Sequence, residues 1–313
     1  MTAKKADRTE PAAVARGPSP GGFRFWRWGL VVVALAAAGV GLWMTVWDQV
    51  RDRVLARPEY RIDSSAIELT PPPPWIHADI KGEVIRSGSL DHALSLVDDA
   101  VTVRIAQAFS LHPWVAKVTR VSKSYPARVE VEAVYRRPAA MVAVSGGLLP
   151  VDGDGVLLPS DDFSPAEAER YPRLMDIKTV PLGPQGSRWG DARVTGGARL
   201  AAVLGDDWQR FHLKMIVPVV PAAGIRSGDD ILYELVTERG TRVTWWHAPG
   251  SERPCDARAN EKLALLRQIF QRDGALEGPD GRPRTLDVRS GRDFSTARRP
   301  TDPAGAPTDE ASR

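Results

Sequence analysis

The sequence predicts an α+β protein that is anchored by a single N-terminal transmembrane helix. Three features predict this class. A long uncharged apolar run lies near the N-terminus, a strand, helix, strand, strand pattern fills residues 75–138, and short strands separated by turns fill residues 139–295. A small βαββ domain followed by a mixed antiparallel β domain with flanking helices would bury the apolar faces of these elements.

The composition of the 313-residue chain excludes several classes of protein. Its single cysteine, Cys255, can form no internal disulfide and no paired-cysteine zinc site. The net charge is only +3 and basic residues are interleaved with acidic ones, so no basic stripe for nucleic acid is present. An exported chain without disulfides fits a bacterial cell envelope better than a disulfide-stapled secreted scaffold.

A transmembrane helix is predicted over residues 26–49. The run from Trp28 to Trp47 carries no charge and matches the ~20 residues that a helix needs to cross the hydrocarbon core. The tryptophans at its ends suit the membrane interface and are Trp26, Trp28, Trp43 and Trp47. Basic residues dominate before the run, whereas those behind it are mixed with aspartates. The positive-inside rule therefore places residues 1–25 in the cytoplasm, as a disordered tail, and the bulk of the chain on the other side.

A cleavable signal peptide is the alternative interpretation of this run. The small residues from Ala34 to Ala38 could serve a peptidase, but the apolar run continues well past them, which favours an anchor.

Residues 50–74 are predicted to form a juxtamembrane proline-rich linker, in which the helix continues to about Arg57 and ends before Pro58. The run from Pro71 to Pro74 favours stiff polyproline II geometry and makes a spacer. A ligand for a proline-reading domain is the alternative, which a position outside the cytoplasm disfavours.

The βαββ domain is predicted over residues 75–138. The segment 75–85 is expected to be extended. Apolar residues then recur at helical spacing over 90–109, which predicts one amphipathic helix or two in tandem, with Ser89 as N-cap. Strands are predicted over 117–124, with a bulge, and over 128–135, with one wet face.

The β domain is predicted over residues 139–295, and a disordered tail over 296–313. The predicted elements are hairpins over 141–151 and 231–247, a short helix from the capping box at Ser164, helices around 200–211 and 263–270, and strands over 213–220 and 285–289. Asp256 or Asn260 is expected to cap the helix at 263–270.

No catalytic, cofactor-binding or metal-binding residues are predicted. The five histidines lack metal-ligand spacing. Asp152 to Gly155 begins like a calcium loop, but Phe163 occupies the position that would need a glutamate, so a turn is expected. The acidic doublets are expected on the solvated surface and are Asp98-Asp99, Asp161-Asp162, Asp206-Asp207 and Asp229-Asp230. Trp245 and Trp246 alternate across a strand, so one ring should enter the core and the other is a candidate interface residue.

The layout resembles the FtsQ/DivIB family of bacterial division proteins, which have a cytoplasmic tail, one transmembrane helix, a POTRA domain and a β domain. The resemblance covers residues 24–295. The segments that carry it are His112 to Val118, Lys123 to Pro126, Val129 to Glu132, Arg136 to Pro138, Leu149 to Val156, Tyr171 to Leu174 and Leu286 to Arg289.

The resemblance implies a non-enzymatic scaffold of the divisome in the inner membrane at the division septum. Its partners would be the small bitopic coiled-coil proteins FtsB and FtsL and upstream division proteins. The proposed mode is strand addition at the last strand, where the candidate residues are Thr285, Leu286, Asp287, Val288, Arg289, Phe294 and Trp246. On the POTRA sheet the candidates for upstream proteins are Val118, Arg120, Val121 and Lys123.

Two other functions stay open. A POTRA-type chaperone or secretion factor of the envelope would bind extended strands promiscuously. A membrane-tethered envelope hydrolase would need two carboxylates facing each other in a cleft.

Overall fold

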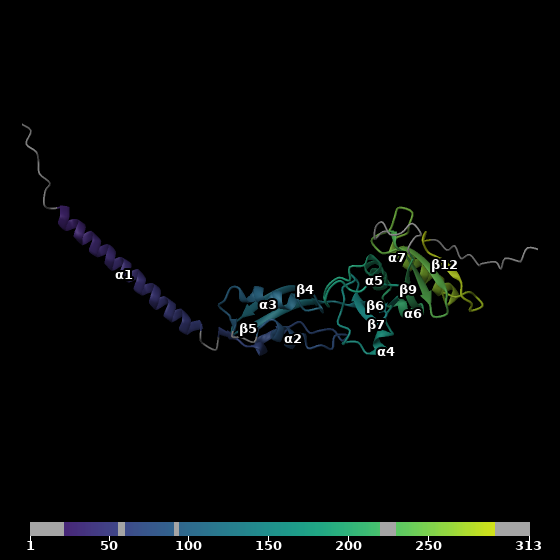
Figure 1. Ribbon diagram of the computed structural model, residues 1–313, viewed down its shortest axis with the longest axis horizontal. Coiled ribbons are helices and arrows are strands. Elements are labelled where there is room, and N and C mark those ends of the chain that lie inside the picture. Colours follow the sequence, from purple (N-terminus) through teal and green to yellow (C-terminus); the bar gives the residue numbers. More distant parts are fainter. Residues whose placement is uncertain (1–21, 56–59, 91–93, 220–229, 292–313) are drawn as a thin grey trace, which may run out of the picture. The chain divides into compact units, whose positions relative to one another are not determined.

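The computed structural model describes residues 22–55, 60–90, 94–219 and 230–291 (Figure 1). The chain divides into two compact units, Met1–Arg61 and Ile62–Arg313. The first unit contains helix α1 (Gly22–Leu55), and the second contains a three-stranded and a seven-stranded sheet with their helices. This is the α+β class that the sequence predicts.

Helix α1 is a candidate membrane span. Its stretch Trp28–Arg51 is long and apolar enough to cross a membrane, and none of the apolar window is buried. Trp28, Trp43 and Trp47 are all exposed, and the rings of the last two stack with centroids 6.2 Å apart. The helix runs on to Leu55, so its predicted continuation past the apolar run is confirmed as far as the described residues reach.

The three-stranded sheet has the order β2-β5-β4. Strands β4 (Val115–Ser124) and β5 (Arg128–Tyr135) are antiparallel, and β2 (Ile67–Leu69) runs parallel to β5. Burial alternates along β5, with Val129, Val131 and Ala133 inside, which confirms the predicted wet face. Two register shifts in β4 confirm the predicted bulge. Smaller elements of this region are β1 (Arg61–Ile62), the 3-10 turn η2 (Ser64–Ala66) and β3 (Leu94–Ser95).

Two helices cover this sheet, and both differ from the prediction. The segment expected to be extended contains α2 (Ile80–Ser87), because Asp79 caps it by accepting a hydrogen bond from the Gly82 N–H at 3.0 Å. The helix expected over 90–109 is only α3 (Val101–Ser110). Ser89 is not its cap but has a φ of 50°. Leu90 and Leu94 are buried in the same core as α3 without being helical, so the spacing of apolar residues over 90–109 predicted a helix that is too long.

The proline run does not separate the anchor from the folded unit. Strand β2 precedes it and pairs with β5, and Ile62 and Ile67 are buried in the core of the three-stranded sheet. Residues 62–69 of the predicted linker therefore belong to the three-stranded sheet, because β2 pairs with β5 and the side chains of Ile62 and Ile67 are buried in its core. The domain boundaries themselves stay predictions.

The seven-stranded sheet has the order β12-β11-β10-β9-β8-β6-β7. Its strands are β6 (Pro138–Val144), β7 (Gly147–Asp152), β8 (Arg173–Leu174), β9 (Leu213–Val219), β10 (Leu232–Thr237), β11 (Arg242–His247) and β12 (Thr285–Asp287). The helices are α4 (Pro165–Ala168), α5 (Ala192–Leu204), α6 (Asp207–Arg210) and α7 (Ala259–Asp273). The hairpins β6-β7 and β10-β11 and the capping box of α4 are confirmed. Side chains from α5 and α7 form one core with the strands.

The two sheets are joined by more than the chain between β5 and β6. The Arg136 guanidinium at the junction binds the buried Asp152 carboxylate at 2.7 Å, and the Trp75 indole donates to the Arg136 carbonyl at 3.1 Å. Leu158, which follows β7, is buried in the core of the three-stranded sheet, and Trp114 donates to the Asp162 carboxylate. Side chains of the first half, which is the three-stranded sheet with α2 and α3, therefore pack against and hydrogen-bond to side chains of the second half, which is the seven-stranded sheet with α4 to α7.

A buried ionic cluster fixes α7 against β11. The Lys262 ammonium lies 2.7 Å from the Asp256 carboxylate, donates to the Trp245 carbonyl at 2.8 Å, and lies over the Trp245 ring. His247 contacts the other Asp256 oxygen at 3.0 Å. Asp256 is thus committed to this cluster, so the prediction that it or Asn260 caps α7 is wrong. The cap position is Arg258, whose N–H is bound by the Glu261 carboxylate.

We predict that Lys262→Ala lowers the free energy of unfolding by about 3–5 kcal/mol, because it leaves the Asp256 carboxylate buried without its cation. Burial lowers the pKa of Lys262, and the hydrogen bond and charge of Asp256 oppose that shift. Urea unfolding followed by tryptophan fluorescence measures the loss. Lys117→Ala, at an exposed position on β4, is the control and should stay within about 0.5 kcal/mol of the unchanged chain. A loss of unfolding free energy for Lys262→Ala that is as small as the loss for the Lys117→Ala control would contradict this account.

Candidate interaction surfaces

Strand β12 is an edge of the seven-stranded sheet among the described residues. It runs parallel to β11, with Leu286 opposite Val243. Leu286 and Val288 are 1% and 0% exposed and belong to the core. A partner could therefore contact only the backbone of these two residues, whereas the side chain of Thr285 is exposed.

The backbone of β12 alternates between its neighbour and the free side. The Arg284 carbonyl accepts from Arg242 at 2.9 Å, and the Val288 N–H donates to Thr244 at 3.3 Å. Because ladder groups alternate along a strand, the backbone groups of Thr285 and Asp287 point away from β11. These two residues form the available edge.

At the C-terminal end of this edge, the backbone groups of Arg289 already have hydrogen-bond partners. The Arg289 N–H donates to the Asp287 carboxylate at 3.0 Å, and the Arg289 carbonyl accepts from Ala257 at 2.7 Å. A partner strand added here would pair along only a short stretch. Such shortening is a common protection of edges against unspecific pairing.

Arg289, Asp287 and Trp246 form a cluster at this edge. The Arg289 guanidinium contacts the Asp287 carboxylate through Nε at 2.7 Å and lies 4.6 Å from the centre of the Trp246 ring. Trp246 has a φ of 80° and lies at the register shift between β10 and β11. It is half-buried, while Trp245 is fully buried, so the predicted alternation of the two rings is confirmed.

The cluster shifts the pKa of its members. Burial raises the pKa of Asp287, but hydrogen bonds from Arg289 outweigh burial and leave that pKa below its ordinary value. The hydrogen bond to Asp287 raises the pKa of Arg289. Both groups are therefore charged at neutral pH. Phe294, the other predicted residue here, lies outside the described residues.

Strand β4, which carries the predicted POTRA residues, is an edge of the three-stranded sheet. Val118 and Val121 are half-buried and pack against its core. Arg120 lies 3.7 Å from Glu132, and Lys123 lies 3.7 Å from Asp99 and donates to the Asp98 carbonyl. The structure thus places the two predicted partner surfaces on different sheets.

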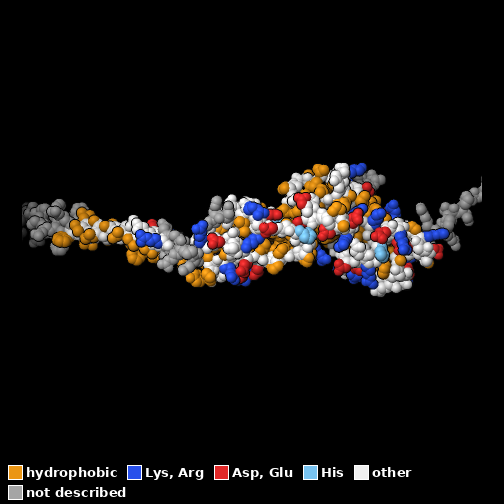
Figure 2. Space-filling view, turned by 90° about the horizontal axis from the view of Figure 1, so that it is seen from below, with side chains coloured by type: hydrophobic (Ala, Val, Ile, Leu, Met, Phe, Trp, Pro, Cys, Tyr) orange, Lys and Arg blue, Asp and Glu red, His pale blue; other side chains and the backbone are white. Residues whose placement is uncertain are grey.

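The remaining polar groups differ in burial. Asp152 accepts from the N–H groups of Asp154 and Val156 at 2.9 Å, so the turn expected there is present. The expectation that the acidic doublets are solvated is wrong for Asp207, which is buried and binds Arg267 at 2.6 Å. Among the described residues, no cluster of His, Cys, Asp and Glu could hold a metal ion. Figure 2 shows acidic and basic side chains interspersed over the face in view.

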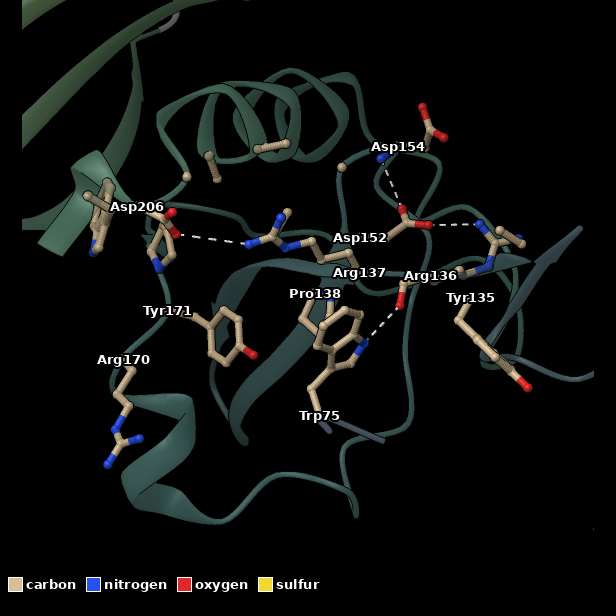
Figure 3. A pocket seen from close by; sticks show the side chains of 18 of the residues that line it. Trp75, Tyr135, Arg136, Arg137, Pro138, Asp152, Asp154, Arg170, Tyr171 and Asp206 are labelled. Atoms are coloured by element: carbon tan, nitrogen blue, oxygen red, sulfur yellow. Dashed lines mark hydrogen bonds and ion pairs between the residues drawn. The ribbon is translucent and has the colours of Figure 1, made fainter. Parts of the chain in front are cut away.

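A cavity of about 590 Å³ that sequence reasoning missed lies where the two sheets meet. Trp75, Tyr135 and Ala116 line it from the first half, and Arg137, Tyr171 and Ala202 are among those from the second (Figure 3). Since these residues come from segments far apart in the sequence, no local sequence motif predicts the cavity.

We predict that Asp287→Asn costs about 1 kcal/mol of unfolding free energy at pH 7, because the charge-assisted bonds to Arg289 weaken. The pKa of Asp287 is lowered in the folded state, so its stabilisation is present above its unfolded pKa of about 3.9 and is lost as the pH falls through the folded value. The difference between Asp287→Asn and the unchanged chain should therefore shrink at acid pH.

Urea unfolding at several pH values tests this expectation. Asp280→Asn, at an exposed position, is the matched control and should change the free energy of unfolding at pH 7 by no more than about 0.5 kcal/mol. A difference for Asp287→Asn that stays constant between neutral and acid pH would contradict it.

Part of the chain is similar to a known bacterial protein. No family model matches the chain. The chain is 40% identical over 122 residues to the cell division protein FtsQ of Anaeromyxobacter sp. (strain K). The match covers 34% of this chain and 39% of that protein, so it spans well under half of either.

Proposed function

We propose that this protein is a membrane-anchored, non-enzymatic division protein of the FtsQ type. The observation that carries the proposal is the 40% identity to a cell division protein named FtsQ. The candidate membrane helix at the N-terminus and the α+β unit after it agree with that similarity. On this proposal the N-terminus lies in the cytoplasm, the sheets lie on the other side, and the three-stranded sheet with α2 and α3 is a POTRA domain.

The proposed role is to gather other division proteins at the septum. Anchoring confines the protein and its partners to two dimensions, which raises their effective concentration. FtsB-like and FtsL-like bitopic coiled-coil proteins would add a strand at β12, and upstream division proteins would contact β4. The support for β12 is its position at a sheet edge with the backbone of Thr285 and Asp287 directed outward.

Depletion of the protein in its native host tests the division role. A fluorescent fusion should concentrate at midcell, and depleted cells should form filaments or fail to complete septa. Microscopy measures both. Uniform envelope fluorescence with normal septation would contradict the role and would favour a chaperone that binds extended strands.

A matched pair of substitutions tests strand addition. Thr285→Pro removes the outward N–H of the edge, and proline is tolerated at edge positions whose N–H faces solvent. Thr285→Ala removes the exposed side chain but keeps that N–H. We predict that Thr285→Pro lowers co-purification of the coiled-coil partners about tenfold, whereas Thr285→Ala leaves it nearly unchanged.

The unfolding free energy of both variants should stay close to that of the unchanged chain, because the core side chains of Leu286 and Val288 are untouched. Equal capture of partners by both variants would reject β12 as the docking edge while leaving the division role intact.

A further inference from the structure

The cavity between the two sheets has an apolar floor. Pro138, Ala139 and Ala201 are buried there, and Trp208 is only 3% exposed. Small side chains on both walls, among them Ala116 and Ala202, leave room for a guest. The volume of about 590 Å³ lies within the roughly 300–1,000 Å³ typical of binding pockets.

The mouth of the cavity carries guanidinium groups that have little to bind. Arg137 lies 4.0 Å from Asp206, with side chains 75% and 104% exposed, so this pair is weak. Arg170 is exposed and forms no ion pair within 4.0 Å among the described residues; the Glu167 carboxylate, which attracts it electrostatically, is hydrogen-bonded to Ser164. Arg136, by contrast, is committed to Asp152 at 2.7 Å.

The charged side chains of the lining are three arginines and three aspartates; Arg136 pairs with Asp152 and Arg137 with Asp206, so Arg170 is left to bind an acidic guest. Gln209 supplies the only side-chain amide of this lining, and its Nε2 already donates to the Arg170 carbonyl at 2.6 Å. The carboxylate of Asp154, which forms no ion pair within the described part of the chain, lies at the opposite end of the site from Arg170 (Figure 3). A planar guanidinium suits a carboxylate, which it can bind through two parallel hydrogen bonds.

We propose that this cavity binds a peptide segment in which a large apolar side chain stands next to a carboxylate. The apolar side chain enters between Trp75 and Tyr171 and rests on the alanine and proline floor. The carboxylate binds Arg170, and Arg137 exchanges its loose contact with Asp206 for the guest. None of these residues belongs to β12 or lies on its edge, so this is a binding site separate from the strand-addition edge.

The test uses the full chain in lipid nanodiscs and a probe peptide, N-acetyl-fluorotryptophyl-glutamate amide, observed by fluorine NMR. Binding should saturate. It should weaken about tenfold when glutamine replaces the glutamate of the probe, or when Arg170→Gln removes the guanidinium. Arg239→Gln, in the turn between β10 and β11, is the matched control and should bind the probe normally.

Ala202→Trp fills the cavity from an exposed position on α5 and should abolish binding without changing the unfolding transition. If Ala202→Trp does not fold, Ala116→Trp fills the cavity from the opposite wall in its place. Absence of saturable binding, equal binding of the glutamine probe, or binding that survives both tryptophan variants would overturn the proposal. Saturable binding of chitotetraose in place of the peptide would also overturn it and would identify a carbohydrate site.

Discussion

The buried ion pair between Lys262 and Asp256 supports the whole end of the seven-stranded sheet. Lys262 comes from α7, and it reaches the backbone of β11 at the Trp245 carbonyl. Strand β12 pairs with β11 alone among the described strands, so its position depends on how firmly β11 is held. A buried charge is costly unless it is paired, and the pairing permits few other arrangements of α7 against the sheet. The geometry of the edge therefore follows from an interaction below the surface.

Elements with a simple period could be predicted from the sequence. The alternation of Val129, Val131 and Ala133 gave β5 and its wet face, and turn residues gave the hairpins of the large sheet. Helix α2 could not be found this way, because it is short and depends on the Asp79 cap. Leu90 and Leu94 imitate a helical period although they reach the same core from a turn and from strand β3, which shows that spacing reports burial more directly than it reports conformation.

The candidate surfaces, too, could be predicted from the sequence only in part. The last strand of the β domain could be predicted as an edge strand, since this follows from its place in the chain and from the alternation of its residues. The burial of Leu286 and Val288 in the core could not be predicted, and neither could the closing of the edge by the contacts of Arg289 with Ala257 and Trp246. The cavity was missed for a related reason. Small residues and prolines form its floor, and such residues are conspicuous only when distant segments come together.

The burial of Leu158 in the core of the three-stranded sheet has a consequence for how this architecture can evolve. Leu158 belongs to the second half by sequence, as does Asp162, which accepts the hydrogen bond from Trp114. A recombination event that exchanged the first half alone, with its crossover at Pro138, would pair Trp114 with a foreign loop. The segment 156–163 therefore has to be inherited together with the half that precedes it, and the unit of exchange is larger than either sheet.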